Sequence, residues 1–379
     1  MKKKILMLAD WYAPGFRAGG PIRSCVNFTA YMQGDYEVYV LTTDRDLHAG
    51  TPYPGLPADR WIDGQHGEKI FYCSPGALTW ATIRRQIRSV APDFIYLNSM
   101  FSSRFTILPL LICRTSGVKA KLILSPRGML RSSAVQFKSG KKKIFLKLFR
   151  WTGISRRIHF LASDPTEEKD VRYYFGPRAK VTIAPNFPAP LPQRPAVPEK
   201  KRGELTMVCI GRVHPIKNTD FLLDVLADTR SKVLLTIVGS LEDQAFWEQC
   251  QEKIRKLPAN INVKYAGELP NDQLPAITSE HHIFVLPTRG ENFGHAIFEA
   301  LLLGKPVLIS DQTPWLGLVA RGAGWDLPLG RPQQFRQAIE DAAHFDQDDY
   351  TRWSDNARHY AEEYLAGSNF KEDYKTLFS

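Results

Sequence analysis

The chain has 379 residues, a formal net charge of +11 and a mean hydropathy of −0.27. With 44% hydrophobic and 23% charged residues, it has enough apolar side chains to build folded cores, which excludes disorder along most of its length. No apolar run reaches the roughly 18 residues that a membrane-spanning helix needs. At about 150 residues per domain, we expect two or three domains.

The first residues, MKKKILMLADWY, are basic and then apolar. A signal peptide is one interpretation, but Asp10 soon interrupts the apolar stretch and no small-residue cleavage site follows. We therefore expect a buried strand there. The five cysteines are scattered and none has C-x-x-C spacing, so neither a disulfide framework nor a zinc site is predicted and a reducing cytoplasm is favoured.

The first half of the chain alternates short apolar runs with helical patterns. Runs of four to six residues suit buried parallel strands better than helices. The predicted strands are Ile5–Ala9, Val38–Thr42, Phe94–Leu97, Lys121–Leu124, Ile158–Ala162 and Val181–Ala184. The predicted helices are Pro21–Met32, Thr79–Val90, Phe105–Cys113, Lys141–Phe149 and Thr166–Phe175.

A proline-rich segment then separates two regions of opposite charge. Six of the fourteen residues in Pro185–Pro198 are proline, which neither continues a helix nor donates to a strand ladder, so a semi-rigid linker is predicted. Before residue 191 there are 29 Lys and Arg against 13 Asp and Glu, and after it 21 against 26. A basic half and a mildly acidic half indicate two domains with different partners.

The second half repeats the alternation of strand and helix. Its predicted strands are Leu205–Ile210, Val233–Val238, Asn262–Tyr265, Ile283–Leu286 and Val307–Ile309. Its predicted helices are Asn218–Leu226, Gln244–Lys256, His295–Leu303 and Pro332–Ala343. Such alternation predicts parallel sheets covered on both faces, with ligands beyond the carboxyl ends of the strands. We expect domains at residues 1–187 and 205–354, a linker at 188–204, and a helical tail at 355–379 that returns to the first domain.

The most specific stretch starts at Arg289 and reads RGENFGHAIFEALLLGKPV. Gly294 lies where a strand meets a helix, and free N–H groups at a helix start can hold an anion. Glu291 and Glu299 are up to about 12 Å apart at 1.5 Å per helical residue, too far for the carboxylate pair of a glycosidase. The spacing suits a long ligand with polar ends and a negative centre, such as a nucleotide-sugar. Two glutamates on a solvated helix are the alternative interpretation.

Three further stretches follow predicted strands. In the second half, Gly211 permits close backbone approach, and Arg212 and Lys217 supply a guanidinium fork and a point charge that suit a diphosphate. In the first half, a glycine pair, Gly19 and Gly20, lies at a turn from strand to helix, without the G-x-G-x-x-G dinucleotide fingerprint. Each of these could also be an ordinary surface turn. So could the third stretch, LSPRGM, which contains Arg127.

Together these stretches resemble the retaining GT-B glycosyltransferases of family 4. The segment E-N-F-G-H-x-x-x-E-A-L-x-x-G-K-P-V matches the family pattern almost throughout, and the resemblance extends over the whole chain. Secondary family segments match at Val238–Ser240, Ala266–Leu269 and Ser310–Trp315. The resemblance implies two Rossmann-like, doubly wound domains that face each other across a cleft.

The resemblance also implies roles for individual residues. Arg212 and Lys217 would hold the diphosphate, Glu291 would orient the donor sugar, and Glu299 would accept from the ribose diol. The remaining implied donor contacts are glycines and loop backbone: Gly19, Gly20, Gly211, the Gly267–Leu269 loop (with Leu269) for the base, and Phe293, Gly294 and His295 for sugar or phosphate. Many relatives carry a histidine where this chain has Arg127, so Arg127 is expected to replace it. Asp10 and His295 are secondary candidates.

Two other features have alternative interpretations. Asp44 and Asp46 form a D-x-D, which ligates a divalent metal in a different glycosyltransferase fold, but here it follows a strand of the first domain. The segment Lys138–Trp151 is basic and amphipathic, and its Phe145, Leu148 and Trp151 could enter an anionic membrane surface. A surface helix with its apolar stripe in the core explains the same pattern. No basic–aromatic alternation supports nucleic-acid binding.

The sequence therefore predicts a retaining transferase that uses a nucleotide-diphosphate sugar, with UDP favoured over GDP, and no metal or other cofactor. Its acceptor would be a saccharide or a polyprenyl-diphosphate-linked saccharide of a bacterial surface polysaccharide. We expect a cytoplasmic protein, with the anionic inner membrane surface as a further partner. The alternatives are a nucleotide-sugar epimerase or phosphorylase on the same fold and a non-catalytic carbohydrate- or nucleotide-binding protein.

Overall fold

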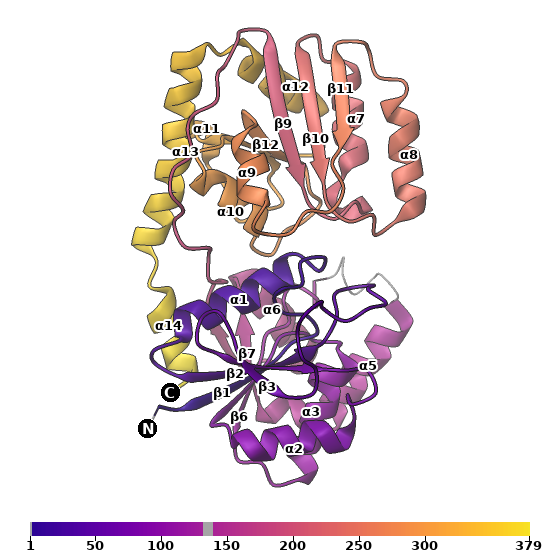
Figure 1. The fold of residues 1–379 in the computed structure, drawn as a ribbon, viewed down its shortest axis with the longest axis vertical. Coiled ribbons are helices and arrows are strands. Elements are labelled where there is room, and N and C mark those ends of the chain that lie inside the picture. The colour runs from indigo at the N-terminus through magenta and orange to yellow at the C-terminus, as the bar shows by residue number, and fades with distance from the viewer. Residues whose placement is uncertain (1, 132–138) are drawn as a thin grey trace. The chain divides into compact units, whose positions relative to one another are not determined.

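The computed structural model describes residues 2–131 and 139–379. The chain forms two compact units, shown as ribbons in Figure 1. Unit 1 comprises Met1–Phe187 and Asn369–Ser379, and unit 2 comprises Pro188–Ser368. Each unit has its own sheet, so the predicted α/β class with two Rossmann-like domains is confirmed.

Unit 1 contains an eight-stranded sheet in the order β3-β4-β2-β1-β5-β6-β7-β8. The pairs are parallel except for β3 with β4, which is antiparallel at the edge. The strands are β1 (Lys4–Leu8), β2 (Glu37–Thr43), β3 (Trp61–Asp63), β4 (Lys69–Cys73), β5 (Phe94–Leu97), β6 (Lys121–Leu124), β7 (Ile158–Ala162) and β8 (Lys180–Ile183). The sequence did not predict β3 and β4, because a three-residue edge strand and a strand starting with a lysine give no alternating pattern.

The helices of unit 1 follow the predicted order. They are α1 (Gly20–Met32), α2 (Trp80–Val90), a π-helical turn (Ser103–Ile107) leading into α3 (Leu108–Thr115), α5 (Ser139–Trp151), a 3₁₀ turn (Ile154–Arg157), α6 (Pro165–Phe175) and α14 (Phe370–Leu377). At the start of α6, Asp164 caps the N–H groups of Thr166 and Glu167, as its sequence signature predicts. The helix therefore begins where the predicted cap places it.

The end of the chain belongs to the core of unit 1. The Phe378 ring packs edge-on against Phe94 and Tyr96, with ring centres 5.3 and 5.7 Å apart. Tyr374 packs against Phe187, the last residue before unit 2, at 4.2 Å. Both termini of unit 2 are thus joined to residues buried in the same aromatic cluster.

Unit 2 contains a six-stranded, wholly parallel sheet in the order β11-β10-β9-β12-β13-β14. This is the doubly wound order in which the chain reverses direction beside the first strand. The strands are β9 (Glu204–Ile210), β10 (Lys232–Val238), β11 (Ile261–Tyr265), β12 (Ile283–Leu286), β13 (Val307–Ser310) and β14 (Gly324–Leu327). Helices α7 (Thr219–Ala227), α8 (Gln244–Ile254) and α12 (Pro332–His344) lie on one face, and α9 (Leu274–Ser279), α10 (His295–Leu302) and α13 (Gln347–Gly367) on the other (Figure 1).

The helical segments of unit 2 are a 3₁₀ turn (Pro215–Lys217), α7 (Thr219–Ala227), α8 (Gln244–Ile254), α9 (Leu274–Ser279), α10 (His295–Leu302), α11 (Leu318–Arg321), α12 (Pro332–His344) and α13 (Gln347–Gly367). The boundary predicted between Ser354 and Asp355 falls inside α13. That helix starts at an Asp346 cap and buries Ala357 and Ala361 in the core of unit 2, so the tail begins later than predicted. Across the described residues, no helix has both the length and the apolar composition that crossing a bilayer requires.

A buried histidine ties the amino end of unit 2's sheet together. His282, just before β12, is 6% exposed. Its Nδ1 accepts from the Thr206 N–H at 2.9 Å, and its Nε2 donates to the Glu199 carbonyl at 2.8 Å. The ring is therefore neutral, because a second proton on Nδ1 would face the Thr206 N–H. Burial lowers the pKa of His282 to about 4.

This geometry predicts a loss of stability in acid. An unfolded histidine takes up its proton near pH 6.5, whereas native His282 takes it up near pH 4, so stability is lost as the pH falls through this window. We expect the free energy of unfolding to fall by about 2 kcal/mol between pH 7 and pH 5 through this residue alone. Urea denaturation at both pH values should give a smaller fall for His282→Gln, and a wild-type fall for the exposed control His359→Gln. Equal falls in all three proteins would contradict the assignment.

Candidate functional site

The carboxyl ends of β9, β10 and β11 are held together by glycines. Gly211 N–H donates to the Val238 carbonyl, and Gly239 N–H donates to the Gly267 carbonyl, each at 2.9 Å. A Cβ at Gly239 would lie 2.0 Å from the Gly211 carbonyl oxygen, and Gly239 has a φ of +145°. Only glycine fits there. The predicted site residues Gly211 and Gly267 therefore lie at the strand ends on either side of β10.

The loop after β9 is fastened to the loop after β12. The Arg289 N–H donates to the Ile216 carbonyl at 2.8 Å, and the Arg289 Nε donates to Asn218 Oδ1 at 3.0 Å. Asn218 has a φ of +62°, a left-handed conformation that asparagine tolerates better than most residues. These bonds bring together the two stretches that sequence analysis treated as separate motifs.

Lys217 and Glu291, one from each motif, form an ion pair. Their side chains are only 17% and 13% exposed, so the pair is partly shielded from solvent. The Glu291 N–H also donates to the Gln312 carbonyl at 3.0 Å, which joins the loop after β13 to the same group. The residues predicted to hold the diphosphate and the donor sugar are thus direct neighbours.

Arg212 is paired with a residue that sequence analysis missed. Its Nη1 donates to both carboxylate oxygens of Glu242, at 2.7 and 2.8 Å. Glu242 lies in the loop after β10, four residues beyond Val238, at the same sheet edge as Arg212. The position of Glu242 just past a strand next to β9 is the sequence signal that could have identified it. Both predicted diphosphate cations are therefore neutralised by carboxylates.

The start of α10 is held in place by aromatic packing. Gly294 is the N-cap with a φ of +76°, and a Cβ there would lie 3.0 Å from the Ile297 side chain. Trp315 Nε1 donates to the Phe293 carbonyl at 2.5 Å, and the two rings pack edge-on. The N–H groups at the amino end of α10 therefore follow a rigid turn. Glu299 lies one turn into the helix, partly exposed.

The candidate residues on the loop after β11 and on α10 complete this edge of unit 2. Leu269 is partly buried against the core, two residues after Gly267. His295 is buried beside the Phe293 ring, with ring centres 4.7 Å apart. Within residues 2–131 and 139–379, no group of three or more His, Cys, Asp or Glu side chains could hold a metal ion.

The sequence-predicted candidates of unit 1 lie at the carboxyl edge of its own sheet. Gly19, with a φ of +64°, precedes Gly20 at the start of α1, and nothing lies within 4 Å of a Cβ built on Gly19. The preceding loop is held by Asp46, whose Oδ2 accepts from the N–H groups of Phe16 and Arg17 at 2.7 and 3.1 Å. Asp44 pairs with Arg45 at 2.8 Å. Both carboxylates of the D-x-D are thus engaged within unit 1.

Arg127 is directed into unit 1. Its guanidinium donates to the Tyr96 hydroxyl at 3.0 Å, to Asn98 Oδ1 at 2.7 Å and to Asn186 Oδ1. Its φ of +56° sets this direction, which a sequence pattern does not reveal. The guanidinium links the end of β6 to the residues just before unit 2, and the donor contact that the resemblance implies for Arg127 stays a prediction.

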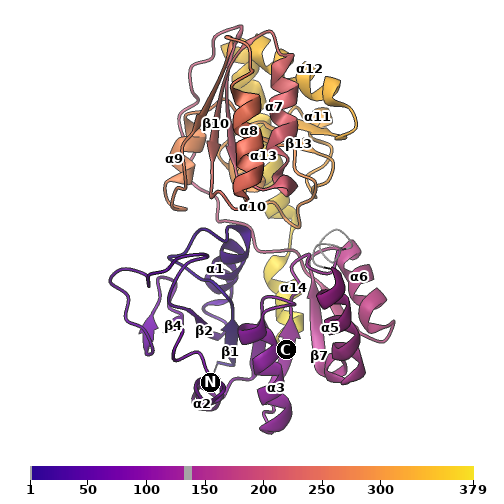
Figure 2. The same ribbon diagram turned by 90° about the vertical axis from the view of Figure 1, so that its right-hand side faces the viewer.

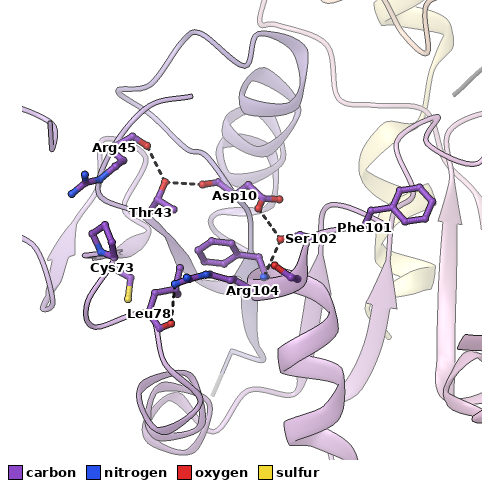
Figure 3. A pocket seen from close by; sticks show the side chains of 11 residues that line it. Asp10, Thr43, Arg45, Cys73, Leu78, Phe101, Ser102 and Arg104 are labelled. Atoms are coloured by element: carbon purple, nitrogen blue, oxygen red, sulfur yellow. Dashed lines mark hydrogen bonds between the residues drawn. The ribbon is translucent and has the colours of Figure 1, made fainter. Parts of the chain in front are cut away.

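A hollow of about 410 Å³ lies beyond β1, β2 and β4 of unit 1 (Figure 3). Asp10 and Ser102 face each other in it, with a hydrogen bond of 2.7 Å from the Ser102 hydroxyl to Asp10 Oδ1. Burial raises the pKa of Asp10. Arg104, whose Nη1 donates to the Leu78 carbonyl at 3.2 Å, supplies a cation, and Leu78 and Phe105 are the apolar lining. The Phe101 ring points away from Asp10 and Arg104 and packs against Phe145. The hollow therefore offers hydrogen-bond donors, an acceptor and an apolar wall.

Most of the second unit matches a known protein family. Residues 192–360 match the family described as "Glycosyl transferases group 1". The chain is 25% identical over 269 residues to the D-rhamnosyltransferase WbpZ of Pseudomonas aeruginosa, covering 66% of this chain and 65% of that protein. It is 31% identical over 110 residues to the O-antigen chain mannosyltransferase B of Escherichia coli, covering 27% and 28%. The matches thus span less than two thirds of these relatives' lengths.

Solved structures share the fold over the whole length. Anabaena HepE, in complex with UDP and glucose, aligns over 99% of both chains with a TM-score of 0.72 and 16% identity. Sucrose-phosphate synthase from Thermosynechococcus elongatus aligns over 100% of this chain and 99% of its own, with a TM-score of 0.71 and 15% identity. At these identities the likeness establishes the GT-B fold, as the sequence predicted.

The position of Arg127 leads to a stability prediction. Replacing Arg127 with Met leaves three buried or partly buried acceptors without their donor, which should lower the free energy of unfolding by roughly 3 kcal/mol. Urea denaturation would measure this, with Arg85→Met on the exposed face of α2 as the control. If Arg127→Met kept wild-type stability and lost only turnover of the donor, the result would support the contact with the donor that the sequence predicts.

Proposed function

We propose that the chain is a glycosyltransferase that moves a sugar from a nucleotide-diphosphate donor to a saccharide acceptor, because residues 192–360 match the glycosyl transferases group 1 family. The observation that carries the proposal is the convergence of Arg212, Lys217, Glu291 and the start of α10 at one sheet edge. Cations and helix N–H groups are what a departing diphosphate requires, since negative charge develops on it as the sugar leaves.

We assign the parts of the donor along this edge. Arg212, Lys217 and the N–H groups at the amino end of α10 bind the diphosphate, and Glu291 binds the sugar hydroxyls. Glu299 accepts from the ribose diol, and the Gly267–Leu269 loop receives the base. The ion pair between Lys217 and Glu291 supports this assignment, because it holds the two side chains next to each other before the donor binds.

The finer identity of the reaction is also proposed. UDP is the favoured nucleotide, which is supported by the UDP and glucose found in HepE, a structural neighbour. Retention of the anomeric configuration, with no metal or other cofactor, follows the family resemblance. The O-antigen chain mannosyltransferase among the relatives supports a saccharide acceptor. That this acceptor is linked to polyprenyl diphosphate, on the cytoplasmic side of a bacterial membrane, follows the family resemblance.

The acceptor binds, on this proposal, in the hollow of unit 1. The Asp10 carboxylate and the Ser102 hydroxyl can accept from and donate to sugar hydroxyls, and Leu78 and Phe105 supply an apolar wall. Arg104 would meet an anionic or hydroxyl-rich group of the acceptor. Unit 1 carries the basic excess of the chain, which suits an acidic or membrane-held acceptor.

The ion pair provides the direct test of the function. Lys217→Ala and Glu291→Ala should each lower kcat/KM for sugar transfer by at least about 100-fold, because each removes a charged contact to the donor. Nucleoside diphosphate release would be measured together with acceptor glycosylation, and the two should rise in equal amounts. Formation of a sugar 1-phosphate from inorganic phosphate, with no release of nucleoside diphosphate, would indicate a phosphorylase instead. Interconversion of the sugar without acceptor glycosylation would indicate an epimerase.

A second ion pair in the same sheet gives the matched control. Lys232 and Glu204 pair at 3.0 Å at the amino ends of β10 and β9, the opposite edge of the sheet. Lys232→Ala should leave transfer unchanged, and circular dichroism should show that all three variants fold. Near-normal turnover in the Lys217 or Glu291 variant would refute the site assignment.

Glu242 yields a prediction of opposite sign. The carboxylate 2.7 Å from Arg212 must give way before a diphosphate can bind that guanidinium. Since ion pairs this exposed contribute about 0.2–1 kcal/mol, Glu242→Gln should lower the donor KM by about two- to fivefold and leave kcat unchanged. Steady-state kinetics over a range of donor concentrations would measure both constants. A raised donor KM would mean that Glu242 orients Arg212 for the donor and does not compete with it.

A further inference from the structure

Helix α5 carries an exposed apolar row that the core of unit 1 does not use. Ile144, Leu148 and Trp151 are spaced to lie along one side of the helix, and they are 61%, 54% and 85% exposed. Sequence analysis placed Phe145 in this row, which is wrong: the Phe145 ring packs against Phe101 and Phe149 at 5.7 and 5.4 Å. Ile144 takes its place, and α5 therefore has two apolar faces.

A basic row runs beside the exposed apolar row. Lys143, Lys147 and Arg150 have the same spacing, one position before each apolar residue, and all three are exposed. Lys142, by contrast, lies over the Phe101 ring at 5.3 Å. Lys138, which belongs to the segment predicted from the sequence, lies outside the described residues. The exposed side of α5 thus alternates cations with large apolar side chains.

The acidic side chains packed near α5 belong to α6, where Glu167 is buried and Glu168 is paired with Arg172. Between Asp93 and Asp164 the chain has no Asp or Glu. The helix lies beside α6 at the outside of unit 1 (Figure 2). The core face of α5 is satisfied by Leu146 and Phe149, which are 3% and 5% exposed. The exposed row is therefore not needed to hold the helix in place.

We propose that the α5 surface, formed by Lys143, Ile144, Lys147, Leu148, Arg150 and Trp151, docks on an anionic phospholipid bilayer. Tryptophan, leucine and isoleucine enter the boundary between headgroups and acyl chains, and lysine and arginine bind anionic headgroups. A protein partner would need a complementary acidic groove, whereas a bilayer meets both rows with one surface. The inference extends the proposed function, since a membrane-held acceptor would be reached from here, but it does not depend on turnover.

Vesicle flotation tests the charged row. Wild type should float with phosphatidylcholine vesicles that contain phosphatidylglycerol and remain unbound with phosphatidylcholine alone. Lys143→Glu/Lys147→Glu should lower the affinity for the anionic vesicles by at least about tenfold. Arg85→Glu/Arg88→Glu, which changes the net charge equally on the exposed side of α2, should bind like wild type. Equal losses in the two double variants would overturn the proposal in favour of non-specific attraction by net charge.

The apolar row has its own control. Leu148→Ser/Trp151→Ser should also reduce vesicle binding, whereas Leu316→Ser/Val319→Ser, which alters two residues of unit 2 that are 52% exposed, should not. Turnover of the nucleotide-sugar with a soluble acceptor should be unchanged in every variant, which separates this proposal from the proposed function. Vesicle binding at the wild-type level by the Leu148→Ser/Trp151→Ser variant would overturn the proposal. So would a wild type that forms a dimer and binds no vesicles, if the same variant is a monomer.

Discussion

The ion pair between Lys217 and Glu291 joins the two stretches of sequence on which the functional interpretation depends. One residue follows β9 and the other follows β12, and the two strands are neighbours only because the parallel order reverses beside β9. The backbone bond from Arg289 to Ile216 fixes the same two loops. A charge pair this shielded is stable only where both loops are held, since an unpaired charge there would be costly to desolvate.

The glycines of unit 2 show what this arrangement requires of the backbone. Gly239 cannot carry a side chain, because the Gly211 carbonyl oxygen occupies the place of its Cβ. That close approach brings the loop after β10, with Glu242, up to Arg212. The edge of unit 2 thus holds two cation–carboxylate pairs, of which the Arg212–Glu242 pair is the more exposed. On the proposed function, this pair would yield to the diphosphate, while the shielded pair would hold Glu291 where it meets the sugar.

The sequence predicted the central strands well because apolar runs without turn residues have few other interpretations. The bounds of Phe94–Leu97, Lys121–Leu124, Ile158–Ala162 and Ile283–Leu286 are confirmed residue for residue. It did not predict the edge strand β3 or the late strand β14, whose first residue is a glycine. The extent of α13 was also missed, since its polar surface resembles a solvated tail more than a helix packed on a domain.

The sequence predicted the residues of the candidate site better than their directions. Motif spacing brought Lys217 and Glu291 into consideration, but it could not show that they pair or that Glu242 neutralises Arg212. The direction of Arg127 depends on a positive φ, which its neighbours in the sequence do not indicate. In α5, apolar residues occur on both sides of the helix, so periodicity alone could not tell the core face of Phe145 from the exposed face of Ile144.

The most direct measurement is calorimetric titration of UDP into wild type and Lys217→Ala. UDP should bind to the wild type, and its affinity for Lys217→Ala should be at least about tenfold lower. Absence of nucleotide binding in the wild type, or equal affinity in both proteins, would contradict it.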